Sequence, residues 1–184
     1  MRIIGGEARG RKLIAPAGLH TRPTSDRARE AVFNILGARV LGAAALDLFA
    51  GSGALALEAL SRGAGRAVLV DSDRAAALAI ERNIRAVKAE NRATLIRSDW
   101  RAAIERLRGE RFALVFLDPP YHMEEVYAQA AQALLEAKCI DSDSVLVMEH
   151  ARGLSPKPPH PFEIYDRRRY ADTEIGFARV LAEK

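Results

Sequence analysis

The hydrophobic residues of this 184-residue chain form short continuous runs that alternate with segments of helical periodicity. Continuous apolar runs are typical of strands that are buried on both faces of a parallel sheet. They predict strands over residues 44–50, 67–71, 93–99, 113–118 and 144–150. Apolar residues at helical spacing predict helices over residues 53–63, 73–87, 100–109 and 124–137. This alternation predicts a doubly wound α/β fold with a mostly parallel sheet.

The two ends of the chain depart from this alternation. Residues 2–16 contain two short apolar stretches around three glycines and predict a β-hairpin. The sequence Pro-Thr-Ser at 23–25 can begin a helix, which we expect to end at Gly37. After a proline-rich segment, residues 162–170 and 174–182 predict two closing strands. We see no repeat or linker, and expect one domain over residues 1–184 with residues 1–23 as a basic hairpin arm.

The positive charge of the chain is localised. Residues 1–36 hold seven basic and three acidic residues, and the rest of the chain balances, so this segment carries the whole net charge of +4. A localised basic segment without an amphipathic pattern indicates a nucleic acid before a membrane. The alternative is a solvated charged surface. The candidates for RNA contacts are Arg9, Arg11 and Lys12 in the arm, and Arg22 and Arg27 near the first helix.

Three features limit the class of protein. Cys139 is the only cysteine, which excludes an internal disulfide and fits the reducing cytoplasm. The chain has no uninterrupted apolar stretch of about 18 residues, and its N-terminus lacks the apolar core of a signal peptide, so we expect no membrane partner. No histidine has metal-ligand spacing, so we expect no metal; the histidines are His20, His122, His150 and His160.

The segment FLDPPY, Phe116–Tyr121, ends the fourth predicted central strand with a carboxylate. Proline cannot donate to a sheet ladder, and it restricts the preceding residue, so the strand ends at Asp118. The side chain of Asp118 is then left at the carboxyl edge of the sheet, where ligands bind in open α/β folds. The alternative is a loop that merely stops a strand, with Asp118 as a solvated turn residue.

A glycine loop follows the first predicted central strand. Gly51 and Gly53 lie between that strand and a helix, where the backbone must approach a ligand closely. Asp71 ends the second strand, 18 residues after Gly53, and can accept hydrogen bonds from the ribose hydroxyls of an adenosine. The loop allows both a nicotinamide dinucleotide and S-adenosylmethionine.

Asp47 separates these two ligands. It ends the first strand, four residues before Gly51, in the wall of the expected crevice. A carboxylate is repelled by a pyrophosphate and attracted by an ammonium or sulfonium group, which favours S-adenosylmethionine. A helix-capping role fits poorly, because Asp47 lies inside the predicted strand. Asp99, which ends the third strand, can accept a hydrogen bond from the adenine amine, cap the next helix, or do both.

With a methyl donor in the crevice, the residues of DPPY can orient an amine that accepts the methyl group. The exocyclic amine of a nucleobase is a poor nucleophile, because its lone pair is delocalised into the ring. The carboxylate of Asp118 and the carbonyl of Pro119 can accept both amine hydrogens, while Pro120 helps to fix the backbone. Tyr121 offers an aromatic face to a flipped base. A nucleophilic-cysteine route is not favoured, since Cys139 lies away from the crevice-forming strand ends.

The chain resembles class I methyltransferases in three motifs: DLFAGSG from Asp47, LVDSD around Asp71, and DPPY from Asp118. The N-terminal segments RIIGGEARGRKL and RPTSDRAREAVFNIL are more specific. They are similar to the N-terminal signature of the RsmD-like bacterial methyltransferases, which modify a guanine N2 in small-subunit ribosomal RNA. The resemblance extends from Arg2 to about Tyr121.

This resemblance implies a seven-stranded sheet whose last strand is antiparallel, with S-adenosylmethionine as donor and ribosomal RNA as substrate. We expect a monomer that acts on RNA within a small-subunit ribosomal particle. The acid that ends the second strand is often glutamate in relatives, so either Asp71 or Asp73 can reach the ribose; we choose Asp71, because Asp73 suits capping. The expected donor-binding residues are Asp47, Phe49, Gly51, Gly53, Asp71, Asp99 and Trp100.

Other hypotheses remain open. DPPY alone does not choose between guanine N2, adenine N6 and cytosine N4, so a methyltransferase of DNA or another RNA is the main alternative. A non-catalytic RNA-binding assembly factor could keep the fold, but it would not need to keep Asp118 and Tyr121. A nicotinamide oxidoreductase is the least favoured alternative.

Overall fold

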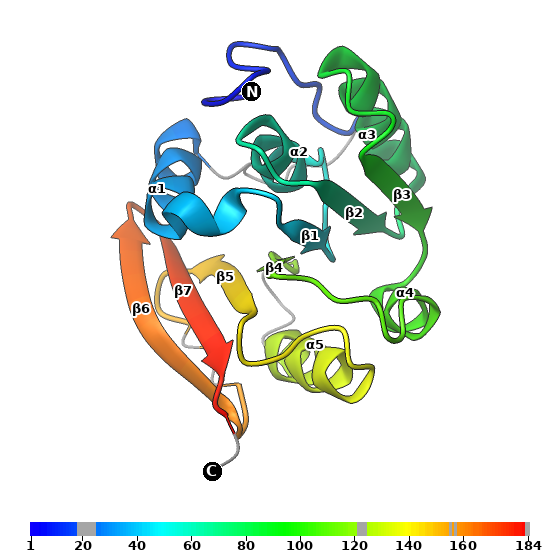
Figure 1. Ribbon diagram of the computed structural model, residues 1–184. Helices are drawn as coiled ribbons and strands as arrows, with labels where there is room; N and C mark the ends of the chain where they lie inside the picture. Colours follow the sequence, from blue (N-terminus) through cyan, green and yellow to red (C-terminus); the bar gives the residue numbers. More distant parts are fainter. Residues whose placement is uncertain (18–24, 121–124, 155, 157, 183–184) are drawn as a thin grey trace.

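The fold is a single seven-stranded sheet with helices on both faces, as the computed structural model shows for residues 1–17, 25–120, 125–154, 156 and 158–182 (Figure 1). Its strand order is β3-β2-β1-β4-β5-β7-β6. Strands β1 to β5 are parallel, and β7 is antiparallel to both of its neighbours. The strands are β1 (Ala44–Asp47), β2 (Arg66–Asp71), β3 (Ala93–Arg97), β4 (Leu114–Leu117), β5 (Val145–Ala151), β6 (Phe162–Tyr170) and β7 (Thr173–Val180). This arrangement confirms the predicted doubly wound fold and its antiparallel last strand.

Two hydrophobic clusters hold the helices on the sheet, one on each face. Successive strand residues point to opposite faces, so Phe116 belongs to the cluster under α1, α2 and α3, whereas Val115 belongs to the cluster under α4 and α5. The helices are α1 (Asp26–Leu36), α2 (Ala54–Ser61), α3 (Arg74–Ala86), α4 (Trp100–Arg106) and α5 (Glu125–Glu136), with a 3₁₀ turn η1 (Gly37–Val40) after α1.

Local capping decides where the helices begin. The side chain of Ser25 accepts a hydrogen bond from the amide of Ala28 at the start of α1. Asp73 caps α3 and Asp99 caps α4 in the same way. These caps explain why β3 ends at Arg97 rather than at the predicted residue 99, because Asp99 already belongs to the helix start. The predicted capping role of Asp73 is confirmed.

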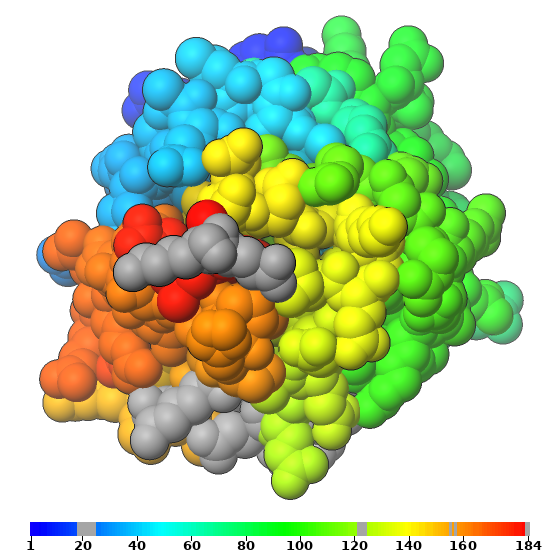
Figure 2. All heavy atoms as spheres, turned by 60° about the horizontal axis from the view of Figure 1, so that its bottom comes forward, coloured from blue at the N-terminus to red at the C-terminus, as the bar shows by residue number. Residues whose placement is uncertain are grey.

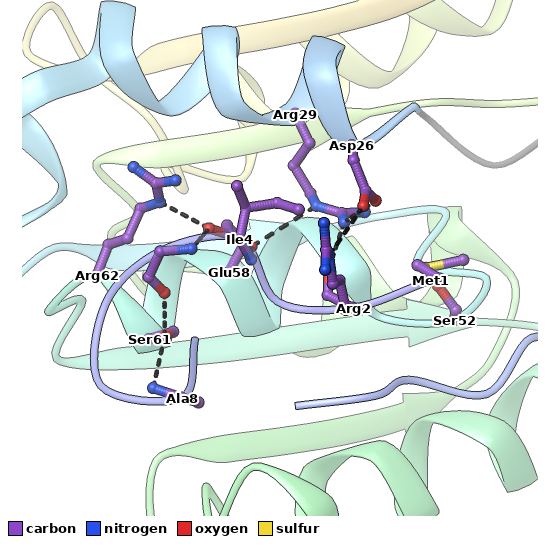
Figure 3. A network of polar contacts seen from close by, with 11 residues as sticks. Met1, Arg2, Ile4, Ala8, Asp26, Arg29, Ser52, Glu58, Ser61 and Arg62 are labelled. Carbon is purple, nitrogen blue, oxygen red and sulfur yellow. Dashed lines mark hydrogen bonds and ion pairs between the residues drawn. The ribbon is translucent and has the colours of Figure 1, made fainter. Parts of the chain in front are cut away.

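The N-terminal segment, residues 1–17, forms a short hairpin around one antiparallel bridge, between Arg2 and Lys12. The Ile3 amide donates to the Arg11 carbonyl at 2.9 Å, and the Leu13 amide donates to the Met1 carbonyl at 3.0 Å. The predicted hairpin is therefore present, although it is too short to contain regular strands. The carboxylate of Glu58 in α2 accepts the amides of Ile4 and Gly5, each at 2.8 Å (Figure 3). These two hydrogen bonds hold the hairpin against the domain.

The two ends of the chain lie on different sides of the domain. Figure 1 places the N-terminus beside α2 and α3, and the C-terminal strands at the opposite edge of the sheet. In Figure 2 the near face carries the orange and red closing strands beside yellow and yellow-green atoms of α5 and the residues after it, with cyan atoms above them, and dark-blue N-terminal atoms appear only at its upper margin. The basic N-terminal segment and the closing strands thus present separate surfaces.

Candidate active site

Four acidic residues lie where the central strands end. Asp47 is the last residue of β1 and Asp71 the last residue of β2. Asp118 directly follows β4, and Glu149 lies near the end of β5. Because these strands are parallel neighbours, their carboxyl ends share one edge of the sheet. That edge is where open α/β sheets bind ligands, and it was predicted from the sequence.

Asp47 is a buried carboxyl group that is only partly satisfied. The residue is 2% exposed, and its Oδ1 atom has no hydrogen-bond partner among the described residues. Burial raises its pKa to about 7, while hydrogen bonds from the Ala56 and Phe49 amides oppose the shift and the nearby charge of Asp71 adds to it. A buried acceptor without a partner fits a cationic ligand group, such as the ammonium of a methionine moiety.

The start of α2 influences Asp47 without being capped by it. Ala56 lies in the first turn of α2, and its amide is the largest influence that lowers the pKa of Asp47. The N-cap residue of α2 is Gly53. Asp47 therefore lies beside the start of the helix and still keeps an oxygen atom without a partner among the described residues for a ligand.

The glycine loop has the backbone geometry that only glycine adopts readily. Gly51 and Gly53 have φ values of 54° and 78°. A Cβ atom on Gly53 would lie 2.7 Å from the side chain of Leu69, so the loop packs closely on β2. From the opposite side, the side-chain amide of Asn83 donates to the Ser52 carbonyl at 2.8 Å. The loop is thus held in place by β2 and α3.

Asp71 connects the glycine loop to the start of α3. Its Oδ2 atom accepts the Gly51 amide at 2.8 Å, and its Oδ1 atom accepts the Asp73 amide at 2.9 Å. Burial is the main cause of its raised pKa. Each oxygen retains a second lone pair for a ligand hydroxyl. Asp73 is used as the cap of α3, so Asp71 remains the candidate for the ribose.

The predicted residues Phe49 and Trp100 lie together beside this edge. Their ring centroids are 6.5 Å apart, and the Trp100 indole Nε1 is buried without a hydrogen-bond partner among the described residues. The guanidinium carbon of Arg101 lies 4.2 Å from the Trp100 ring centroid. Asp99 caps α4 through the Arg101 amide at 2.9 Å. Phe49, Asp99 and Trp100 are therefore grouped, as an adenine-binding wall requires; their contact with a ligand stays a prediction.

Asp118 occupies the position that DPPY predicts. β4 ends at Leu117, so Asp118 emerges at the sheet edge, followed by the buried Pro119 and the exposed Pro120. The pKa of Asp118 lies well above its usual range, because of burial first and then the nearby charges of Glu149 and Asp47. Tyr121, the last residue of the motif, lies outside the described residues.

Glu149 is the functional candidate that the sequence analysis missed. Leu117 of β4 is in register with Met148 of β5, which places Glu149 beside Asp118. Glu149 is 5% exposed. An acid at the end of the apolar run SVLVMEH was a usable signal, since Asp47 and Asp118 also follow apolar runs. The neighbouring position of these two strands could not be derived from the run itself.

The predicted RNA-contacting residues differ in their positions. Arg9, Arg11 and Lys12 are exposed on the N-terminal segment, and Arg27 is exposed on α1. Arg22 lies outside the described residues. These four exposed side chains are accessible to phosphates. The segment that carries Arg9, Arg11 and Lys12 is nevertheless packed on the domain.

The fold, the glycine loop and the partly satisfied Asp47 define a class I methyltransferase. The family model described as "Conserved hypothetical protein 95" matches residues 1–179, and the chain belongs to this family of RsmD-like methyltransferases. Its cofactor is S-adenosylmethionine.

Two relatives and one solved structure illustrate the similarity. The chain is 38% identical to "Putative rRNA methyltransferase YlbH" of Bacillus subtilis over 83% of each chain. It is 46% identical to "Ribosomal RNA small subunit methyltransferase D" of Escherichia coli K12, over 66% of this chain and 60% of that relative. The structure of "Putative methyltransferase yhhF from Escherichia coli" superimposes with a TM-score of 0.87 at 33% identity, covering 100% of this chain and 99% of the other.

Two further features concern metals and membranes. Within the described residues, no group of three or more His, Cys, Asp or Glu side chains is arranged to hold a metal ion. No helix in the same ranges has both the length and the apolar character needed to cross a membrane.

Proposed function

We propose that this protein transfers a methyl group from S-adenosylmethionine to the exocyclic N2 amine of a guanine in small-subunit ribosomal RNA. The observation that carries the proposal is the position of Asp118. Its carboxyl group emerges at the sheet edge immediately before two prolines, close enough to Asp47 for the charge of Asp47 to raise its pKa. An acceptor for an amine thus lies beside the residue that we assign to the donor. The names of the two relatives support ribosomal RNA as the substrate.

Each residue has a definite task in this reaction. S-adenosylmethionine supplies a methyl group on a positively charged sulfur, which a nucleophile can displace directly. Asp47 attracts the positive charge of the donor, and Asp71 orients its ribose. Asp118 accepts a hydrogen bond from the amine, which holds the nitrogen lone pair toward the methyl group. As the N–C bond forms and the S–C bond breaks, the nitrogen loses a proton, and the raised pKa of Asp118 suits it to receive that proton.

We assign RNA binding to the exposed basic side chains of the N-terminal segment. Arg9, Arg11 and Lys12 face solvent on a segment that α2 holds in place, so they present a fixed set of charges to phosphates. We take residues 1–184 as one catalytic domain that acts as a monomer on a small-subunit ribosomal particle in the cytoplasm. In this arrangement residues 1–23 position the RNA and the sheet edge carries out the chemistry.

The direct test is to compare methylated nucleosides in ribosomal RNA from cells with and without this protein. We expect one N2-methylguanosine in the small-subunit RNA to disappear with the protein and to return on complementation. Complementation with an Asp118→Ala variant should not restore it. Loss of an N6-methyladenosine or N4-methylcytidine instead would assign the enzyme to another base. An unchanged set of methylated nucleosides in all cellular RNA would contradict the proposal.

A further inference from the structure

The amine of guanine differs from the other exocyclic amines in its neighbour on the ring. Guanine presents two adjacent donors, the N1–H and the N2 amine. In adenine and cytosine the amine has a ring nitrogen beside it that accepts a hydrogen bond. Enzymes that flip a base read this edge through hydrogen bonds. A site specific for guanine N2 therefore needs a second acceptor beside the one that holds the amine.

Such a pair of acceptors exists at the ends of β4 and β5. Because Leu117 is in register with Met148 in a parallel pair, Asp118 and Glu149 follow as neighbours. Side chains alternate along a strand, so both acids follow the parity of Phe116 and Val147, which lie in the cluster under α1. The charge of Glu149 acts on Asp118 more strongly than that of Asp47 does, which agrees with this proximity.

The backbone of Glu149 is held on both sides. In β7, Ile175 is its register partner. The hydroxyl of Tyr127 in α5 donates to the Glu149 carbonyl, and the Tyr127 ring packs edge-on against His150 with centroids 6.3 Å apart. A residue fixed by a neighbouring strand and by a helix can hold its carboxyl group in a defined position, as base discrimination requires.

We propose that Glu149 is the residue that selects guanine, accepting a hydrogen bond from N1–H while Asp118 accepts one from the N2 amine. This inference rests on the proposed function and deepens it. A third carboxyl group supports a ligand at this edge, because the Oδ1 atom of Asp47 is buried without a partner among the described residues. Asp47 serves the donor, and the pair of Asp118 and Glu149 serves the base. Adenine and cytosine would turn a ring-nitrogen lone pair toward Glu149, which repels a carboxylate.

The test compares guanine with 2-aminopurine at the mapped target nucleotide, in reconstituted small-subunit particles. 2-Aminopurine keeps the amine at position 2, but its N1 accepts a hydrogen bond instead of donating one. Wild-type protein should strongly prefer guanine by kcat/KM. In Glu149→Gln the new side-chain amide can donate to N1 of 2-aminopurine. The guanine preference should then fall by at least about tenfold, the size expected when one hydrogen bond is matched in one base and mismatched in the other.

Glu174→Gln is the matched control. Glu174 is also a buried glutamate at this end of the sheet, and Arg169 and Arg167 bind it. Its substitution should leave the preference between the two bases unchanged. An unchanged preference in Glu149→Gln, with methyl transfer to guanine still measurable, would overturn the assignment of Glu149.

A second variant covers the case in which Glu149→Gln does not fold, as judged by its circular dichroism. Glu149→Asp keeps the charge and the acceptor but shortens the side chain, so it should lose rate on guanine and still reject 2-aminopurine. A kcat/KM for guanine equal to that of wild-type protein in Glu149→Asp would also overturn the assignment. Failure of the proposed function has a different signature, because wild-type protein would then leave the guanine-containing particle without N2-methylguanosine.

Discussion

Arg29 of α1 and Glu58 of α2 form an ion pair whose side chains are both 0% exposed, with 3.6 Å between Arg29 Nε and Glu58 Oε2 (Figure 3). Glu58 also accepts Arg62 Nε at 2.7 Å. The guanidinium of Arg29 donates to the Arg2 carbonyl and to Asp26. The pair therefore joins two helices and the N-terminal segment, and it places the segment that we assign to RNA on the same body as the donor site.

Breaking this pair should destabilise the whole domain. Glu58→Ala removes the buried partner of Arg29, leaving only the half-exposed Asp26 to pair with it, and removes the acceptor of two backbone amides in the N-terminal segment. We expect a loss of about 3–5 kcal/mol in the free energy of unfolding, measured by urea denaturation. Glu81→Ala, which removes an exposed acid from α3, should change it by less than about 1 kcal/mol. A loss equally small for Glu58→Ala would mean that the network contributes little.

Donor binding should depend on Asp47 and on pH. Asp47→Asn should weaken S-adenosylmethionine by about 1–3 kcal/mol in calorimetry, because it removes a buried charge-assisted interaction. Burial raises the pKa of Asp47 from 3.8 to about 7 in the free protein, and the donor binds the ionised form. Affinity for wild-type protein should therefore increase as the pH rises from about 6 to about 8, one unit on either side of that pKa, and this increase should vanish in Asp47→Asn. Tight binding of a nicotinamide dinucleotide in place of S-adenosylmethionine would refute the donor site.

Substitutions on the base side of the site should lower methyl transfer without lowering the affinity for the donor. Asp118→Ala should abolish methyl transfer while S-adenosylmethionine affinity stays nearly unchanged, because Asp118 acts on the amine. Tyr121→Ala should weaken base engagement by about 1–3 kcal/mol, the usual size of a base–aromatic stacking interaction. Single-turnover assays on small-subunit particles measure both effects. Near wild-type turnover by Asp118→Ala would remove its assigned role.

The N-terminal segment should contribute salt-dependent RNA binding. Reversing Arg9, Arg11 and Lys12 to glutamate should weaken RNA binding and flatten its salt dependence, by a log–log slope of about 0.7–0.9 for each phosphate that the variant no longer neutralises. Affinity for S-adenosylmethionine should barely change, because the donor motifs begin at Asp47. Filter binding over a range of salt concentrations measures the slope.

A matched charge reversal elsewhere controls for net charge. Arg82, Arg85 and Arg106 are exposed on α3 and α4, and their reversal to glutamate changes the charge by the same amount. We expect this control to retain a slope close to that of wild-type protein. Equal slopes in both triple variants would assign the N-terminal charges a structural role only.

Local signals in the sequence were sufficient for the strands, the glycine loop and the caps. The two prolines stop β4 at the residue before Asp118, and Asp73 begins α3 through its own side chain, so each feature depends on residues close together in the chain. What could not be predicted depends on contacts between distant segments. Glu149 lies beside Asp118 only because β5 pairs with β4 in a particular register.

The hairpin and Asp47 show the same limit. The glycines of the N-terminal segment favour a turn, but the attachment of the hairpin to the domain depends on Glu58, more than 50 residues away, which accepts the amides of Ile4 and Gly5. The Ala56 amide lies close enough to Asp47 to lower its pKa, because the loop between them folds back on β1. Neither contact leaves a periodic pattern in the sequence, and both therefore emerged only from the structure.

The central claim is that the carboxyl group of Asp118 directs methyl transfer to a guanine N2, and one measurement tests it most directly. Purified wild-type and Asp118→Ala proteins are incubated with labelled S-adenosylmethionine and unmethylated small-subunit particles, and the RNA is digested to nucleosides. The account predicts label in N2-methylguanosine with wild-type protein and none with the variant. Label in N6-methyladenosine or N4-methylcytidine, or equal labelling by Asp118→Ala, would contradict it.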